Sequence, residues 1–302
     1  MFLLVLLYGP LLTACSQPQK PMAQNITSID ALGKTITLAG PAKQIISLAP
    51  SNTEILFAIG AGPQVVGRDA FSDYPAEAAE LADIGGGFGE LNLEIIIAAN
   101  PDLVLAADLT PPEQIQTLED AGLTVFALRN PNSFEELYEN IQTVAQMAGH
   151  EKNAAALIEE LKGRVSAVAE AVATISDLPL VFYELDSTDT NAPWTSGPGT
   201  FIDTLITMAG GINLGGELEG AWVQISIEEL ITRDPNLIIL GDFTWGGITP
   251  EMVVSRSGWE GLSAVQNNQV YTIDDNLVSR PGPRLVDGLE TMARLLHPDL
   301  FE

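Results

Sequence analysis

Short apolar runs that indicate buried strands alternate with helical patterns along most of the chain. The apolar runs cover residues 45–49, 103–106, 124–128 and 180–185. Helices are predicted from about 51 to 59, 110 to 121, 133 to 149, 200 to 209 and 284 to 296. This alternation predicts an α/β fold with mainly parallel sheets.

Two local signals refine the start of the pattern. A hairpin is expected from residues 26–29 and 35–38, which flank Leu32-Gly33-Lys34. Ser51 and Glu54 stand at the spacing of a capping box, in which each side chain bonds to the other's backbone. We therefore expect these two residues to cap the first helix.

Residues 151–174 carry one long amphipathic helical pattern and no strand signal. Its apolar positions recur at spacings of four, four, three and four: Leu157, Leu161, Val165, Val168 and Val172. At 1.5 Å per residue this helix would be about 36 Å long, enough to join two lobes. We expect three parts: an N-terminal lobe over 26–150, a linking helix over 151–176 and a C-terminal lobe over 177–302.

One segment of the chain is echoed later. Residues 92–105 return 134 positions on as residues 226–239. Both read as a polar N-cap, an acid at the second helical position, a short helix, a proline-containing turn and a buried strand. The echo predicts two lobes built on one plan, and a chance similarity between helix-turn-strand units is the alternative.

The N-terminus carries a different kind of pattern. Residues 2–14 are almost wholly apolar but too few to span a membrane, so we expect a signal peptide over 1–14. Leu12-Thr13-Ala14-Cys15 looks like a lipobox, with Cys15 as the lipidated residue, and residues 15–25 would form a flexible tether. No Lys or Arg precedes the apolar run, which leaves open a start upstream of Met1.

Composition excludes several classes of function. The 302 residues hold 40 Asp and Glu against 13 Lys and Arg, giving a formal net charge of -27, which repels nucleic-acid phosphates. Hydrophobic residues make up 46%, so the chain is not intrinsically disordered. One cysteine and two histidines provide no zinc cluster and no disulfide within the chain. We expect no metal and no resident cofactor.

The motifs of common enzymes are absent. Gly33-Lys34-Thr35 lacks the first glycine of a phosphate loop, and Ser196-Gly197-Pro198-Gly199 lacks the order of a nucleophile elbow. His150 and His297 stand at the ends of predicted helices. We expect a protein that is not an enzyme. An envelope hydrolase, with one of these histidines as its base, stays as an alternative.

Four large aromatic residues stand in predicted glycine-containing loops, two in each lobe: Phe71, Phe88, Trp194 and Trp222. Loops at the strand ends of two such lobes face the crevice between them, where ligands of open α/β sheets bind. Opposed aromatic faces would enclose a large flat or amphipathic molecule. The alternative is that each ring packs within its own lobe.

Four segments together resemble the substrate-binding proteins of ABC importers for cobalamin, haem and ferric siderophores: 44–54, Ser72-Asp73-Tyr74-Pro75, Asn92-Leu93-Glu94 and 279–284. The resemblance covers the chain from about residue 43 and is strongest to the cobalamin-binding members. It implies two α/β lobes joined by a single long helix, with a permease and its ATPase as partners. A monomer in the cell envelope, lipid-anchored and outside the cytoplasm, is expected.

The resemblance also implies roles for individual residues. Phe71, Phe88, Trp194 and Trp222 match positions of corrin-contacting aromatics, and Arg280 matches a polar contact. Two of the four are Phe where Tyr or Trp is expected, which weakens the assignment of the ligand.

The echoed acids Glu94 and Glu228 match glutamates that dock onto permease arginines. As acids in first helical turns they would also stabilise their own helices, by about 0.3–1 kcal/mol each.

The sequence therefore predicts a lipid-anchored binding protein that captures cobalamin and delivers it to an ABC importer. Haem or a ferric siderophore is the alternative ligand. The net charge disfavours polyanionic ferric complexes, but Arg68, Arg280 and Arg284 are able to reverse the field locally. A protein that binds only a macromolecule is the third class.

Overall fold

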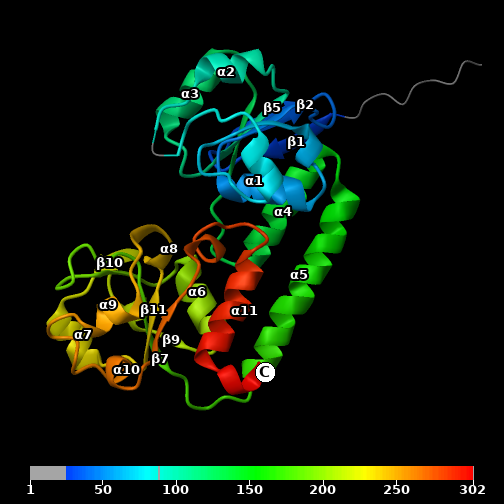
Figure 1. Cartoon of the computed structure of the whole chain (residues 1–302). Helices are drawn as coiled ribbons and strands as arrows, with labels where there is room; N and C mark the ends of the chain where they lie inside the picture. Colours follow the sequence, from blue (N-terminus) through cyan, green and yellow to red (C-terminus); the bar gives the residue numbers. More distant parts are fainter. Residues whose placement is uncertain (1–24, 88, 302) are drawn as a thin grey trace, which may run out of the picture.

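Two four-stranded parallel sheets form the two lobes of the fold (Figure 1). The computed structural model describes residues 25–87 and 89–301, so the predicted signal peptide, Cys15 and Phe88 lie outside the described residues. In the N-terminal lobe the strand order is β4-β3-β5-β6, and in the C-terminal lobe it is β12-β11-β7-β9. The predicted α/β fold is confirmed.

The N-terminal sheet consists of β3 (Ile45–Ser47), β4 (Val65–Arg68), β5 (Leu103–Ala107) and β6 (Val125–Leu128). The C-terminal sheet consists of β7 (Leu180–Glu184), β9 (Ile212–Asn213), β11 (Leu237–Leu240) and β12 (Val270–Thr272). Two antiparallel ribbons accompany them: β1 (Ile26–Ile29) with β2 (Thr35–Leu38), and β8 (Trp194–Ser196) with β10 (Trp222–Gln224). The first ribbon is the predicted hairpin.

Helices of the N-terminal lobe are α1 (Pro50–Ala58), α2 (Leu93–Ala98), α3 (Pro112–Asp120) and α4 (Phe134–Ala148). Those of the C-terminal lobe are α6 (Phe201–Met208), α7 (Ile227–Arg233), α8 (Phe243–Gly246), α9 (Pro250–Val254), α10 (Ser263–Gln266) and α11 (Leu285–Leu296). Short 3₁₀ turns are η1 (Gly62–Gln64), η2 (Ala76–Glu80), η3 (Leu214–Glu217), η4 (Asp275–Leu277) and η5 (Pro298–Leu300).

The long helix α5 (Glu151–Val172) runs beside both lobes (Figure 1). Its 22 residues give a length of about 33 Å. It packs on α4 at one end and on α11 at the other, where Arg164 forms ion pairs with Asp287 at 2.5 Å and Glu290 at 2.8 Å. In the described part of the chain, no helix combines the length and the apolar character that crossing a membrane requires.

The predicted capping box at the start of α1 is wrong. The helix begins at Pro50 with Ala49 as its N-cap, and no side chain caps it. Ser51 and Glu54 are both buried inside the helix instead. The Glu54 carboxylate bonds to Arg284 of the other lobe, because an ion pair satisfies a buried charge better than a backbone N–H.

Each sheet separates two hydrophobic clusters, as alternating side chains require. In the N-terminal sheet, Ile45 and Leu105 face one cluster, while Ile46 and Val104 face another. In the C-terminal sheet, Tyr183 faces the first of these clusters, and Phe182 faces a third cluster on the other side of the sheet. The first cluster is common to both lobes.

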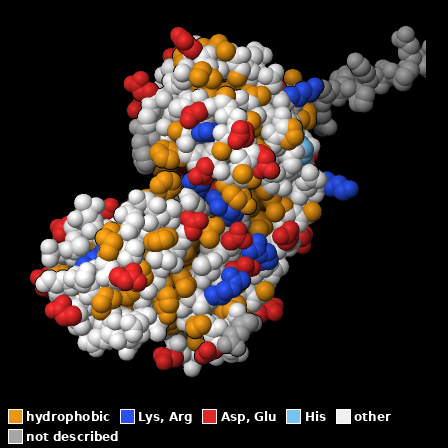
Figure 2. Space-filling view, in the orientation of Figure 1, with side chains coloured by type: hydrophobic (Ala, Val, Ile, Leu, Met, Phe, Trp, Pro, Cys, Tyr) orange, Lys and Arg blue, Asp and Glu red, His pale blue; other side chains and the backbone are white. Residues whose placement is uncertain are grey.

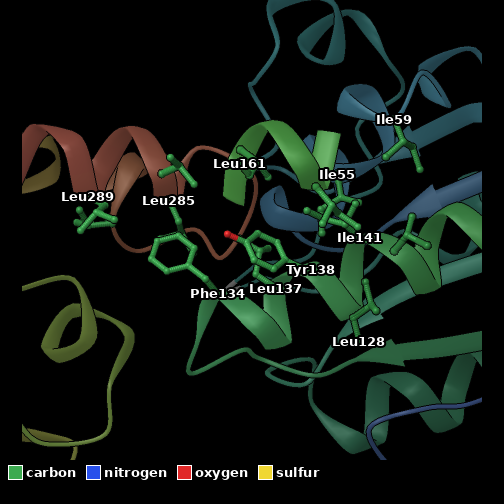
Figure 3. Packing of buried hydrophobic residues seen from close by; sticks show 14 of the residues in the cluster. Ile55, Ile59, Leu128, Phe134, Leu137, Tyr138, Ile141, Leu161, Leu285 and Leu289 are labelled. Carbon is green, nitrogen blue, oxygen red and sulfur yellow. The ribbon is translucent and has the colours of Figure 1, made fainter. Parts of the chain in front are cut away.

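This shared core passes through α4, α5 and α11 (Figure 3). Leu137 and Leu161 belong to it together with Leu285, and the Phe134 ring of α4 meets the Phe201 ring of α6 edge to face at 5.3 Å. Because the two lobes bury apolar surface against the same cluster, large relative movement would expose it to water.

The internal echo is present in three dimensions. Helix α2 leads into β5 and α7 leads into β11, and each strand lies inside its sheet. Asn100 and Asp234, which are 134 positions apart, both adopt a left-handed conformation after the helix, with φ of 46° and 47°. The two lobes therefore repeat one plan down to a backbone angle.

Candidate ligand-binding cleft

The carboxyl edge of the C-terminal sheet carries a pocket of about 360 Å³. Its walls come from the ends of β7 and β11, from α8 and from the turn before α11: Leu185, Asp186, Gly241, Asp242, Trp245, Gly246, Asp275 and Ser279. Helix α8 lies on the side of this lobe that faces the N-terminal lobe, and the molecular surface is hollowed where the lobes meet (Figures 1 and 2). This is the position at which open α/β sheets bind ligands.

Two aromatic rings meet across the lobes beside this pocket. Phe71, from the loop after β4, packs edge to face on Trp245 of α8, with ring centroids 6.3 Å apart. Trp245 is 61% exposed and lines the pocket, although it is not among the four aromatic residues predicted to bind the ligand. It stands in a glycine-containing segment directly after a buried strand, which is the signal that marked the other aromatics.

Trp194 and Trp222 lie in strands rather than in the loops that were predicted. Each begins one strand of the ribbon β8–β10, where Trp222 is paired with Ser196 and Trp194 with Gln224. Residues paired in this way, and residues two apart on one strand, share a face of the ribbon. The two indoles therefore lie diagonally on one side, 38% and 51% exposed.

A buried polar network holds the loop that carries Phe71. Asp69 accepts the backbone N–H of Phe71 at 3.0 Å and a short hydrogen bond from the Ser72 hydroxyl. Ser72 in turn bonds to Thr53 of α1 at 2.8 Å. Burial raises the pKa of Asp69, and these donors oppose the shift. The network fixes the backbone that positions the ring.

Charged residues join the lobes next to this loop. Arg284 donates two hydrogen bonds to Glu54, at 2.6 and 3.0 Å, and stacks over the Tyr74 ring at 3.9 Å. Arg280 donates to Asp73 at 2.5 Å and lies 3.9 Å from Glu54. We call Glu54, Asp73, Arg280 and Arg284 the lobe junction.

The two acids of the lobe junction differ in environment. Burial raises the pKa of Glu54, which is 3% exposed, even though Arg284 and Arg280 lower it. Burial also raises the pKa of Asp73, but the hydrogen bond and charge of Arg280 outweigh that and hold it below its ordinary value. Arg280, the predicted ligand contact, is itself buried and faces these acids.

A second arginine cluster lies at the end of β7. Arg256 forms a two-armed ion pair with Glu184, at 2.5 and 2.9 Å, and donates to the Ser187 hydroxyl at 2.8 Å. Ser187 donates to Asp242 of the pocket at 2.6 Å. Burial raises the pKa of both acids, and Arg256 opposes the shift in each.

The positive charges around the cleft are thus neutralised within the chain. Arg68, at the end of β4, contacts Asp83 at 3.3 Å and the Asp69 carbonyl at 3.0 Å. Arg256, Arg280 and Arg284 likewise form ion pairs, so each of these arginines has a carboxylate partner within the chain. Within residues 25–87 and 89–301, no three metal-ligating acids, histidines or cysteines gather as a metal site.

The echoed acids remain at the surface. Glu94 in the first turn of α2 and Glu228 in the first turn of α7 are both exposed. Side chains of Asn92 and Ser226 cap the two helices by accepting the backbone N–H of Ile95 and of Glu229. The acids are therefore not needed as caps.

Both histidines have structural partners. His150 Nε2 lies 3.0 Å from Gln64 Oε1, and His297 Nε2 lies 3.0 Å from the Gly210 carbonyl oxygen. Neither lines the cleft pocket. The residues needed by the hydrolase alternative are therefore placed away from the cleft.

Comparison with known proteins agrees with this architecture. The periplasmic binding protein family matches residues 45–277. The chain belongs to this family. Over 312 residues this periplasmic binding protein is 33% identical to an uncharacterized ABC transporter substrate-binding lipoprotein, YvrC of Bacillus subtilis, with 99% of this chain and 96% of that one covered.

Two further relatives differ in ligand. A cobalamin-binding protein of Halobacterium salinarum is 30% identical over 294 residues, which cover 94% of this chain and 75% of that one. The solved structure of the haem-binding protein RhuT from Roseiflexus sp. RS-1 superimposes with a TM-score of 0.76 at 26% identity, covering 86% of this chain and all of that one. The protein is thus an ABC-type substrate-binding protein, which acts outside the cytoplasm, and not an enzyme.

Proposed function

We propose that the protein captures a corrinoid, cobalamin, in the cleft and delivers it to an ABC importer. The observation that carries the proposal is the combination of exposed aromatic rings with cleft arginines, Arg256, Arg280 and Arg284, that each form an ion pair within the chain. A corrinoid has a large flat ring system and neutral peripheral amides, so it gains from aromatic contact, and its amides need no free cation. The cobalamin-binding relative from Halobacterium supports this choice.

Haem is the second candidate, because RhuT shares the fold. Its two propionates require cationic or hydrogen-bond-donating partners. In the pocket described here the charged lining is acidic, from Asp186, Asp242 and Asp275. Burying a propionate beside these carboxylates would cost free energy, which favours the neutral amides of a corrinoid.

Titration of the purified protein with cyanocobalamin, haemin and ferrichrome tests the ligand. We expect saturable binding of cyanocobalamin with a dissociation constant below about 10 µM, equivalent to at least about 7 kcal/mol. Haemin and ferrichrome should bind more weakly. Tighter binding of haemin or ferrichrome than of cyanocobalamin would contradict the proposal. It would show that the cleft offers partners for carboxylate or hydroxamate groups other than the paired arginines.

Delivery would use the two exposed acids, Glu94 and Glu228, as a pair of contacts to permease arginines. The sequence resemblance suggested this role, and two surface charges on equivalent helices fix the orientation of docking. We expect the double variant Glu94→Ala with Glu228→Ala to keep its affinity for cyanocobalamin and to lose uptake. The variant Glu229→Ala is the control, since it removes an exposed acid from the same helix. A loss of ligand affinity would instead assign the pair to the fold or the cleft.

The anchor would be the lipid on Cys15, in keeping with the lipoprotein relative from Bacillus. In cells that express the full chain, Cys15→Ala should move the protein from the membrane fraction to the soluble fraction. Retention of the variant in the membrane would show that another segment holds it there.

A further inference from the structure

Asp242 keeps one oxygen without a hydrogen-bond donor. Asp242 is 8% exposed and lines the cleft pocket. Its Oδ2 accepts a hydrogen bond from the Ser187 hydroxyl. Oδ1 is buried and has no partner among the described residues. An unsatisfied buried acceptor costs about 1–3 kcal/mol, and more when it is charged. Such a cost is expected where a ligand supplies the missing donor.

The surrounding hydrogen bonds fix Asp242 as an acceptor. Arg256 donates to Ser187 Oγ, so the single hydroxyl hydrogen of Ser187 is directed to Asp242 Oδ2. The other contacts of Arg256 are taken by Glu184. The hydrogen bonds from Arg256 to Ser187 and from Ser187 to Asp242 therefore hold the carboxylate in place, but they supply no donor to Oδ1.

The other two acids of the pocket are already occupied. Asp275 accepts from the Trp245 indole N–H at 3.2 Å and from Ser279 at 2.5 Å. Asp186 accepts the backbone N–H and the hydroxyl of Thr188, at 3.0 and 3.2 Å. Asp275 thus positions the ring of Trp245, and the acid of the same pocket that has an oxygen without a donor is Asp242.

We propose that Asp242 is a specificity-determining residue, whose Oδ1 accepts an N–H from a peripheral amide of the bound ligand. The role rests on the proposed function, because it presumes a ligand that carries amides. A carboxylate at the same place on the ligand offers no hydrogen and is repelled by Asp242. The pocket therefore distinguishes an amide edge from an acid edge, a difference that a purely aromatic site would not register.

The test compares cyanocobalamin with its monocarboxylic acid derivatives, in each of which one side-chain amide is hydrolysed to a carboxylate. The wild-type protein should bind cyanocobalamin at least about tenfold more tightly than one of these derivatives, the size expected for a hydrogen bond to a charged group. Asp242→Asn should reduce that ratio to near one, because an asparagine amide donates to a carboxylate as well as it accepts from an amide. Unfolding midpoints of both proteins verify that the variant is folded.

Asp186→Asn is the matched control, since it removes the same charge from the same pocket at a carboxylate that already has donors. It should lower the ratio much less than Asp242→Asn does, because it weakens only the general repulsion between like charges and removes no acceptor that lacks a donor. Equal changes in both variants would assign selectivity to the charge of the pocket rather than to Asp242. Wild-type protein that binds cyanocobalamin and every acid derivative equally would overturn the role of Asp242 alone. Wild-type protein that binds no corrinoid would overturn the proposed function itself.

Discussion

The lobe junction and the cleft pocket use the same residue types to different ends. At the junction, Glu54 and Asp73 each face an arginine from the other lobe, so their charges are compensated across the interface. In the pocket, Arg256 reaches Asp242 only through Ser187, and Asp242 Oδ1 is left without a donor. A fully paired cluster serves the fold, while an incomplete one has capacity left for a ligand.

Geometry explains the difference. A guanidinium carries five N–H donors in a rigid fork, and at Glu54 the fork of Arg284 meets both carboxylate oxygens. The fork of Arg256 meets both oxygens of Glu184 instead. Asp242 follows β11, the strand next to β7, and it is linked to Arg256 only through the Ser187 hydroxyl.

Breaking the junction should have the largest effect. Arg284→Met removes both hydrogen bonds to the buried Glu54 carboxylate and leaves only Arg280, 3.9 Å away, to compensate its charge. We expect the free energy of unfolding to fall by about 3 kcal/mol, the lower end of the range for a broken buried ion pair. Urea unfolding followed by far-ultraviolet circular dichroism measures this. Adding Glu54→Gln should restore part of the loss, because the buried charge is then removed.

The control for that variant is Lys34→Met, which breaks an exposed ion pair with Glu119 and should cost at most about 1 kcal/mol. If Arg284→Met lowers the free energy of unfolding by no more than this control does, the junction ion pair behaves as an exposed one. The lobe junction would then not be a stabilising cluster of the kind contrasted with the pocket.

Removing an aromatic face of the pocket should have an intermediate effect. Trp245→Ala should weaken cyanocobalamin binding about tenfold, since a lost aromatic contact is worth about 1.4 kcal/mol. Phe243→Ala is the matched control, because Phe243 is an exposed aromatic of the same short helix that does not line the pocket. Isothermal titration should show a much smaller change for Phe243→Ala, and equal losses would place the ligand elsewhere.

The smallest effect concerns acid sensitivity. Arg164 lowers the pKa of Glu290, so this pair stabilises the fold above the ordinary carboxyl pKa and the stabilisation is lost as the pH falls through the lowered value. Glu54 acts in the opposite sense, because its pKa is raised in the folded state and protonation there favours folding. Arg164→Met should therefore reduce the loss of stability between about pH 6 and pH 3, by up to about 1 kcal/mol.

Thermal unfolding across that range measures the pH dependence. An unchanged dependence in Arg164→Met would show that the remaining carboxylates dominate the acid response. The ion pair between α5 and α11 would then contribute no measurable pH-dependent stability.

Much of the fold was predictable because its signals are local. The side-chain caps Ser133 and Thr200 stand where the sequence placed the helix starts, and α5 follows directly from its apolar period. The capping box at Ser51 failed because Glu54 had a better partner 230 positions away. The roles of Phe71, Trp194 and Trp222 in binding stay predictions, and so does that of Phe88, which lies outside the described residues.

The sequence by itself determined two echoed α/β lobes, the linking helix and the excess of acid, since periodicity and composition are properties of neighbouring residues. Only the tertiary structure decided which acids pair with arginines, that the Trp245 ring packs on Phe71, and that one oxygen of Asp242 has no hydrogen-bond donor. Those pairings join residues far apart in the chain, and a pattern along the chain carries no information about the distance between their side chains in space.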